Sequence, residues 1–211
     1  MLAVDRYELG PIGTNCYIAR VDHGALEAVV VDPSGDATQL RLELARAGAS
    51  CAAILVTHTH WDHLLAVADL AEGTGAPVYA PQLELDVIEN PSAYYPGIGV
   101  PIRGWVPEHS LSGGEKIDEA GIAFEVVHVP GHSPGHLAYY ADECLFSGDV
   151  LFAGSIGRTD LPHGDYETLI GSIRTLVDRF PPETIVYSGH GPETTLGNEL
   201  ARNPFLEELR A

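Results

Sequence analysis

Cysteine is scarce in this chain of 211 residues, and its scarcity excludes two kinds of scaffold. The three cysteines, Cys16, Cys51 and Cys144, stand at unrelated spacings and form no CxxC pair. An odd number without paired spacing indicates neither a disulfide framework nor a cysteine-based zinc knuckle. We therefore expect a protein of a reducing compartment.

Positive charge is also scarce. Acidic residues outnumber basic ones 30 to 11, Lys116 is the only lysine, and the formal net charge is -19. A chain of this charge repels phosphate backbones unless a local basic patch overrides the repulsion, and its arginines are dispersed. We expect no nucleic-acid partner and interpret the charge as a solubility or salt-adapted surface.

Long apolar runs are absent, so we expect no membrane partner. The first residues, MLAVDRYELG, contain neither a basic region nor an apolar stretch of the kind that marks a secreted protein. These features favour a cytoplasmic location. The sequence does not indicate an oligomeric state.

Short β-branched runs closed by Gly, Pro, Asp or Ser predict strands, and apolar residues at helical spacing predict helices. The expected strands are residues 16–19, 28–32, 52–58, 124–129, 144–149 and 184–190. The expected helices are residues 36–48, 62–73 and 165–180, the second starting at Asp62 and stopping at Gly73. Because strands and helices alternate in a chain of this length, we expect one α/β domain over residues 1–211.

Residues 90–115 are rich in Pro and Gly and show no period. Long loops inside compact domains are commonly functional. Two interpretations stay open: a flap that faces the substrate, and an ordered surface loop held down by Tyr94, Tyr95 and Trp105.

The stretch THTHWDH, residues 57–63, carries three histidines and an aspartate in seven positions. His58 and His60 are two residues apart, so in extended backbone they point to the same side, as two ligands of one ion would. Asp62 and His63 can turn toward a second point nearby. Clustered imidazoles without a metal would repel on protonation, so this stretch predicts a metal site that can supply two ions.

Further ligands are expected at other strand ends, because α/β sheets gather their chemistry at the carboxyl edge. His132, Asp149 and His190 each follow a predicted strand. With the first motif they make a set of five imidazoles and two carboxylates. One carboxylate can bridge two ions about 3.5 to 4 Å apart, and we assign the bridge to Asp149.

The runs THTHWDH, GHSPGH, SGD and SGHG, in this order, resemble the metallo-β-lactamase superfamily over essentially the whole chain. Residues 151–165 and 188–206 resemble its hydroxyacylglutathione hydrolase (glyoxalase II)-like branch, in the short type without the C-terminal helical domain. The resemblance implies a four-layer αβ/βα sandwich with the metals at one edge of the sheets. It also implies the following ligands: His58, His60 and His132 for the first metal, Asp62, His63 and His190 for the second, and Asp149 for both.

The branch implies a metal-bridged hydroxide that attacks a small-molecule thioester of the S-lactoylglutathione type, with Asp62 orienting that hydroxide. A thiolate leaves without a strong general acid, because the pKa of its thiol is about 8.5. True β-lactamases usually lack an aspartate at the bridging position and are exported, which argues against antibiotic hydrolysis. We expect two divalent ions, zinc first, with iron or manganese as alternatives.

The remaining histidines and arginines have weaker assignments. We interpret His23 and His128 as structural and His136 as a support of the ligands, and leave His109 and His163 undecided. Two arginines are candidates to attract an anionic substrate: Arg103, and Arg158, for which a structural pairing with Asp160 is the alternative.

Rival functions stay open at this point. A mononuclear Fe(II) persulfide dioxygenase of the same fold would use His58, His132 and Asp149. A serine hydrolase would use Ser133 of GHSPG, but Pro134 lacks the N–H that its oxyanion hole needs. A nuclease is disfavoured because no basic tract accompanies the ligands. A non-catalytic metal-binding module is disfavoured because the ligand set leaves room for a water molecule on the metal.

Overall fold

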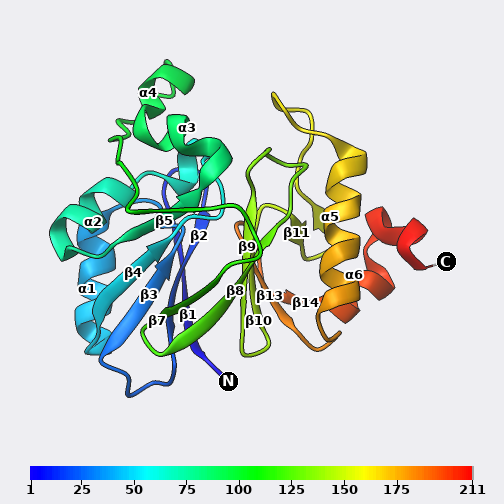
Figure 1. Ribbon diagram of the computed structural model, residues 1–211, viewed down its shortest axis with the longest axis horizontal. Coiled ribbons are helices and arrows are strands. Elements are labelled where there is room, and N and C mark those ends of the chain that lie inside the picture. Colours follow the sequence, from blue (N-terminus) through cyan, green and yellow to red (C-terminus); the bar gives the residue numbers. More distant parts are fainter. Residues whose placement is uncertain (211) are drawn as a thin grey trace.

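Two six-stranded sheets face each other and carry helices on their outer faces in the computed structural model, which describes residues 1–210 (Figure 1). The first sheet has the order β1 (Ala3–Leu9), β2 (Thr14–Arg20), β3 (Glu27–Val31), β4 (Ser50–Leu55), β5 (Val78–Pro81), β6 (His109–Leu111). The second has the order β14 (Thr194–Thr195), β13 (Ile185–Ser188), β10 (Cys144–Gly148), β9 (Leu137–Ala141), β8 (Ile122–His128), β7 (Lys116–Glu119). A small hairpin joins β11 (Leu151–Phe152) to β12 (Ser155–Ile156).

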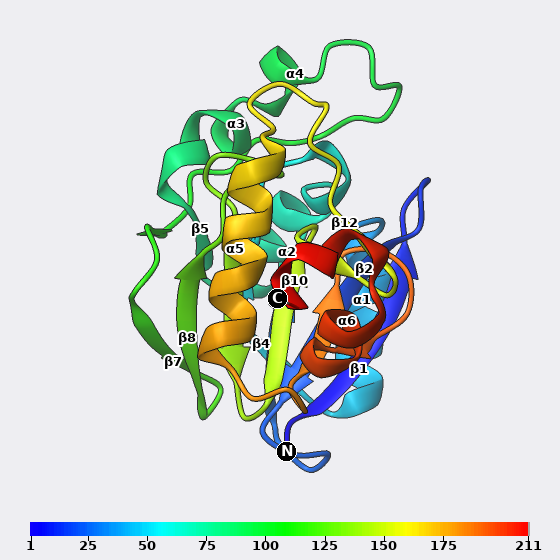
Figure 2. The same ribbon diagram turned by 90° about the vertical axis from the view of Figure 1, so that its right-hand side faces the viewer.

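The helices complete a four-layer αβ/βα sandwich, which confirms the expected fold. Helices α1 (Ala37–Ala47) and α2 (Val67–Thr74) cover the first sheet, and α5 (Tyr166–Arg179) covers the second, with α6 (Leu196–Arg202) beside it (Figures 1 and 2). The shorter elements are α3 (Leu85–Glu89), α4 (Pro91–Tyr94), η1 (Trp61–His63), η2 (Gln82–Glu84) and η3 (Pro204–Arg210). In the part of the chain that is described, no helix has the length and apolar character needed to cross a membrane.

Three apolar layers hold the sandwich together. One lies between the first sheet and its helices, one between the two sheets, and one between the second sheet and α5. In the middle layer, the ring of Tyr17 meets that of Phe146 edge to face, with centroids 5.6 Å apart. Strand β10 is buried along its whole length, which explains why its sequence shows no alternation.

All six predicted strands are present, and two of the three helices begin and end where predicted. Helix α1 begins after Asp36, whose side chain accepts a hydrogen bond from the Thr38 N–H, and ends at Gly48 with φ of 70°. Helix α5 begins after Asp165 and ends at Phe180. The sequence did not predict the edge strands β1, β6, β7 and β14, nor β5, β9 and α6.

The helix predicted over residues 62–73 is wrong at both ends. Residues Trp61–His63 form a short 3-10 turn, and α2 begins only at Val67 and ends at Gly75, which has φ of 74°. Asp62 does not cap a helix, because its Oδ2 instead accepts a hydrogen bond from the Thr14 hydroxyl at 2.7 Å. The preceding strand also ends earlier than predicted, at Leu55, so the histidines lie on a loop.

The segment 90–115 is more structured than its sequence indicates, since it contains α4 and β6. Tyr95 holds it down by donating its hydroxyl hydrogen to the Thr59 carbonyl at 2.8 Å, and Trp105 packs against the first apolar layer. Tyr94 is half exposed and does not anchor the loop. In Figure 1 the segment around α4 lies above the edge of the sheet at which β4 ends.

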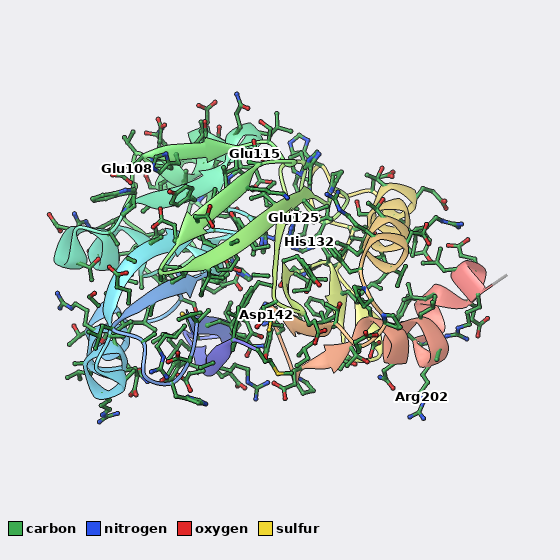
Figure 3. All side chains as sticks on the ribbon, turned by 60° about the horizontal axis from the view of Figure 1, so that its bottom comes forward. Glu108, Glu115, Glu125, His132, Asp142 and Arg202 are labelled. Carbon is green, nitrogen blue, oxygen red and sulfur yellow. The ribbon has the colours of Figure 1, made fainter. Side chains whose placement is uncertain are left out.

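Charged side chains are spread over the surface, among them Glu108, Asp142 and Arg202 (Figure 3). The structure places Arg103 and Arg158, the two candidates to attract an anionic substrate, in ion pairs. Arg103 binds both Asp69 and Glu72.

Candidate metal centre

The seven predicted metal-binding residues lie together at one edge of the two sheets. Four of them, His58, His60, Asp62 and His63, lie on the segment that follows β4. The other three come from the second sheet: His132 after β8, Asp149 directly after β10 and His190 after β13. The carboxyl ends of strands in both sheets therefore supply the cluster, as the sequence predicts.

His58, His60 and His132 form the first group. Each offers one ring nitrogen, and these nitrogens all lie within 4.8 Å of one another. The Nε2 atom of His58 is 3.1 Å from Nδ1 of His60. Two ligands of one tetrahedral ion, each about 2.1 Å from it, lie roughly 3.4 Å apart. The spacing of this group therefore suits a single cation.

Asp62, His63 and His190 form the second group, again within 4.8 Å of one another. The Oδ2 atom of Asp62 lies 3.4 Å from Nε2 of His63 and 3.3 Å from Nε2 of His190. His190 is partly exposed whereas the other two are buried, so the cluster meets solvent on the side of His190.

Asp149 lies between the two groups. Its Oδ2 is 3.5 Å from Nε2 of His132 in the first group, and its Oδ1 is 3.5 Å from Nε2 of His63 in the second. Its Oδ2 also lies 3.6 Å from Nε2 of His190 in the second group. The carboxylate of Asp149 thus reaches ligand atoms of both groups, as a bridging ligand does.

Several buried polar atoms of the cluster have no hydrogen-bond partner in the described chain. They are Nε2 of His63, Nε2 of His132 and Oδ1 of Asp149, all of which face the cluster. An unsatisfied buried polar atom is costly, so such atoms need an explanation. Divalent cations held by nitrogen and oxygen ligands would satisfy all three, and the residues therefore fit a metal centre.

Asp32 supports this cluster, and the sequence analysis missed it. Its Oδ2 accepts hydrogen bonds from Nδ1 of His63 at 2.9 Å and from the Thr57 hydroxyl at 2.7 Å, while its Oδ1 accepts from the Thr57 N–H at 2.7 Å. Asp32 also lies within 4.8 Å of ligand atoms of His58 and His63. Because both its oxygens are already engaged, we regard Asp32 as a support of the ligands.

His132 and His136 are held by backbone groups. Nδ1 of His132 donates to the Arg158 carbonyl at 2.8 Å, which leaves Nε2 free to face the cluster. Nε2 of His136 accepts from the Asp149 N–H at 3.1 Å, and its ring stacks on that of His58 with centroids 4.5 Å apart. The structure thus gives His136 the supporting place that we expected.

Glu84 is a second buried carboxylate that sequence analysis missed. Its Oε2 accepts from the N–H and the hydroxyl of Thr59, each at 2.8 Å, and its Oε1 accepts from the Gly135 N–H at 2.8 Å. Thr59 stands between His58 and His60 on the loop that follows β4, and Gly135 belongs to the loop that carries His132. Glu84 therefore ties together the two loops that supply the first group.

Burial is the main influence on the pKa values of His58 and His60. It lowers the pKa of His58 well below the ordinary value, and the neighbouring His63 acts in the same direction. Burial, with His132 contributing, lowers the pKa of His60 to about 4. These imidazoles are therefore neutral at pH 7 and have lone pairs available for a cation.

His63 behaves differently. Burial lowers its pKa, but the carboxylates of Asp32 and Asp149 together outweigh burial and raise the pKa well above the ordinary value. In the metal-free protein this histidine is a cation between two carboxylates. A metal ion would take over the place of its proton.

The remaining candidates lie outside the cluster. His109 stacks on Tyr79 at the edge of the first sheet, and His163 is exposed on the loop before α5. His128 is hydrogen-bonded to the Pro134 carbonyl at 2.9 Å, and His23 lies in a turn. The buried Ser133 hydroxyl has no hydrogen-bond partner among residues 1–210, so no base is placed to activate it as a nucleophile.

Arg158 is paired with Asp160, as the structural alternative predicted. Its Nε donates to Oδ1 of Asp160 at 2.8 Å and its Nη2 to Oδ2 at 2.7 Å. Both side chains are exposed.

The fold and the cluster together define the class of protein. Residues 9–190 match the model of the metallo-beta-lactamase superfamily, and the chain belongs to that superfamily. It is 38% identical over 184 residues to the hydroxyacylglutathione hydrolase GloC of Haemophilus influenzae, a match that covers 85% of this chain and 87% of that protein.

Two solved structures extend the comparison. The BLEG-1 B3 metallo-beta-lactamase superposes with a TM-score of 0.90 at 42% identity, over 97% of this chain and 100% of that one. TTHA1623 in a di-iron-bound form superposes with a TM-score of 0.85 at 40% identity, over 96% and 100%. The chain is thus a metal-dependent hydrolase with a His/Asp metal-binding cluster.

Proposed function

We propose that this protein is a binuclear metallo-hydrolase that cleaves small-molecule thioesters of the S-2-hydroxyacylglutathione type. The observation that carries the proposal is the place of Asp149, whose two oxygens each lie 3.5 Å from a ligand nitrogen of a different group. Five imidazoles and two carboxylates suit zinc first, and iron or manganese next. The likeness to GloC supports the thioester class.

Each of the proposed ligands has a defined place in this scheme. His58, His60 and His132 would hold the first cation, Asp62, His63 and His190 the second, and Asp149 both. Bound there, two cations would make water a nucleophile at neutral pH and stabilise the oxyanion of the tetrahedral intermediate.

Asp62 has a second task, which is to orient the attacking water. Its Oδ2 accepts the Thr14 hydroxyl at 2.7 Å, which fixes the carboxylate. Burial raises its pKa, but His190 and His63 outweigh burial and lower the pKa to about 2. Asp62 therefore stays ionised at neutral pH and accepts a hydrogen bond from the water.

No histidine of the cluster is free to act as a general acid. Each one faces a proposed cation or a hydrogen-bond partner. A thioester needs none, because its leaving thiolate is stable at a pH near its thiol pKa of about 8.5. An amide would need a proton for its leaving amine. The cluster thus favours thioesters.

The proposal is tested by metal analysis of the purified protein, run beside assays of S-lactoylglutathione and simpler thioesters. We expect about two divalent ions per chain, loss of hydrolysis on chelation and its return with zinc. His58→Ala and Asp149→Ala should each abolish turnover. Near-normal rates in either variant would overturn the assignment of the ligands.

β-Lactam hydrolysis is a second candidate, because the BLEG-1 B3 metallo-beta-lactamase is 42% identical to this chain. Assay of a chromogenic cephalosporin beside the thioesters separates the two activities. The persulfide dioxygenase alternative predicts sulfide-dependent oxygen consumption by the iron-loaded protein, and that result would replace the hydrolase proposal.

A further inference from the structure

The loop from Pro91 to Ile102 borders an open hollow of about 430 Å³ that the proposed chemistry does not use. Proline, glycine and aliphatic residues supply all of its lining except Ser92 and Tyr95. None of the lining residues is charged. Sites for small molecules have volumes of about 300 to 1,000 Å³ and are mostly apolar with a few polar groups, so the hollow has the size and the lining of such a site.

Tyr95 connects the hollow to the metal-binding cluster. Its ring lines the hollow, and its hydroxyl donates to the carbonyl of Thr59, the residue between His58 and His60, at 2.8 Å. Because Thr59 stands between two proposed ligands, this hydrogen bond places the phenol of Tyr95 close to the cluster. Since one side chain contacts both, the hollow lies beside the cluster, next to the place where a group attached to a carbonyl at the cluster would lie.

The charges around the hollow do not suit an anion. Arg103 directly follows the lining segment, but Asp69 and Glu72 bind its guanidinium group. A carboxylate of glutathione placed in the hollow would lose water without gaining a counter-ion, which is unfavourable.

We propose that this hollow, lined by residues 91–102 and joined to the cluster through Tyr95, binds an uncharged aliphatic or aromatic part of the substrate. This inference rests on the proposed thioesterase function: it keeps the reaction and replaces glutathione as the preferred thiol. The enzyme then hydrolyses acyl thioesters of an uncharged thiol better than S-lactoylglutathione.

The first experiment compares two series of thioesters with the zinc-loaded protein. One series lengthens the acyl chain on N-acetylcysteamine, from acetyl to octanoyl, and the other keeps an acetyl group and lengthens an alkanethiol. We expect kcat/KM to rise about threefold per methylene in one series until the hollow is filled. The series that rises identifies which side of the thioester the hollow holds. A flat response in both, with S-lactoylglutathione preferred, overturns the inference.

A pair of variants tests the place of binding. Ile98 lines the hollow, so Ile98→Asp should lower kcat/KM at least tenfold for the favoured long-chain thioester, mainly through KM, and lower it much less for S-lactoylglutathione. Ile98→Leu should keep the wild-type preference. Val106→Asp is the matched control, because Val106 is exposed on the same segment but does not line the hollow. Equal losses for both substrates in Ile98→Asp would contradict the inference.

Binding to the metal-free protein separates the inference from the proposed function. Calorimetric titration with the S-hexyl thioether of N-acetylcysteamine should show binding that Ile98→Asp weakens at least tenfold and Val106→Asp leaves unchanged. If this holds but no thioester is hydrolysed, the proposed function fails and the hollow remains a binding site. If thioesters are hydrolysed and the thioether does not bind, the inference fails alone.

Discussion

Asp32 connects the two groups of proposed ligands through one oxygen. Its Oδ2 accepts from Nδ1 of His63 at 2.9 Å and from the Thr57 hydroxyl at 2.7 Å. That hydroxyl in turn lies 3.0 Å from Nδ1 of His58, and it accepts because its own hydrogen is given to Asp32. One buried carboxylate thus orients a histidine of each group and leaves the opposite ring nitrogen of both free for a cation.

Replacing Asp32 should therefore weaken metal binding without removing a ligand. In Asp32→Asn, one oxygen cannot accept all three hydrogen bonds that the carboxylate accepts. We expect metal affinity to fall about 10- to 100-fold, as measured by competition with a chromogenic chelator. Asp36→Asn, at the exposed start of α1, is the control and should bind metal normally. Unchanged affinity in Asp32→Asn would show that this contact does not orient the ligands.

Glu84 gives a prediction on stability. The carboxylate is 4% exposed and accepts three hydrogen bonds from Thr59 and Gly135. In Glu84→Gln one amide oxygen remains, and the NH2 group faces a donor. We expect the free energy of unfolding to fall by about 1–3 kcal/mol. Urea unfolding of the metal-free protein measures it.

The control for Glu84 is an exposed acid with no buried contact. Glu183 is exposed in the turn before β13. Glu183→Gln should therefore change the free energy of unfolding by less than about 0.5 kcal/mol. A similarly small effect for Glu84→Gln would mean that the two loops hold their positions without this carboxylate.

The sequence predicted which side chains gather in the cluster better than it predicted which residues support them. His58 belongs to a dense histidine motif and Asp149 directly follows a predicted strand. Both patterns indicate metal binding from the sequence alone. Asp32 gave a comparable signal, because it ends a buried strand just as Asp149 does, but a lone aspartate there is compatible with an ordinary turn. Glu84 gave no signal, since it meets Thr59 and Gly135 only after the chain has folded.

The helices show the same difference between features set by local sequence, which could be predicted, and features set by tertiary contacts, which could not. The start of α1 could be predicted because Asp36 caps it through a local hydrogen bond. An aspartate, Asp62, also stands before the apolar periodic run that contains α2. It does not cap a helix there, because a contact with Thr14, 48 positions away, turns its side chain into the cluster. A tertiary contact of this kind overrides a local capping pattern, and it leaves α2 to begin five residues later.

Gly189 leads to a further prediction, because no side chain fits there. A Cβ atom at this position would lie 2.1 Å from Oδ1 of Asp149 and 2.7 Å from Cε1 of His63. We expect Gly189→Ala to displace the proposed bridging carboxylate and reduce both metal content and activity at least tenfold. Metal analysis and thioester assays measure this.

The control for Gly189 is Gly171, which lies within α5 and has open space around its Cβ position. Gly171→Ala should keep full activity and stabilise the protein by up to about 1 kcal/mol, because alanine favours the helix. Equal metal content in both variants would contradict the close approach at Gly189.

The stability of the metal-free protein should fall as the solution is acidified from pH 7 to pH 5. An unfolded histidine takes up a proton near pH 6.5. His60 has a pKa of about 4 in the folded protein, and His58 and His136 have pKa values well below the ordinary one. Between about pH 6.5 and pH 4 the unfolded chain therefore binds more protons than the folded chain, and the free energy of unfolding decreases as the pH falls.

His63 and His190 oppose this trend only in part. Their pKa values are raised in the folded chain, so the folded chain binds these protons first. The opposing effect ends at about pH 5.5, where the unfolded histidines are protonated as well. His60 alone accounts for roughly 2 kcal/mol between pH 7 and pH 5. Urea unfolding of the metal-free protein across this range measures the loss, and His60→Asn should make it smaller by about that amount. A wild-type stability that is equal at pH 5 and pH 7 would mean that these imidazoles are not held neutral, and that the lone pairs the proposed cations need are not prepared by the fold.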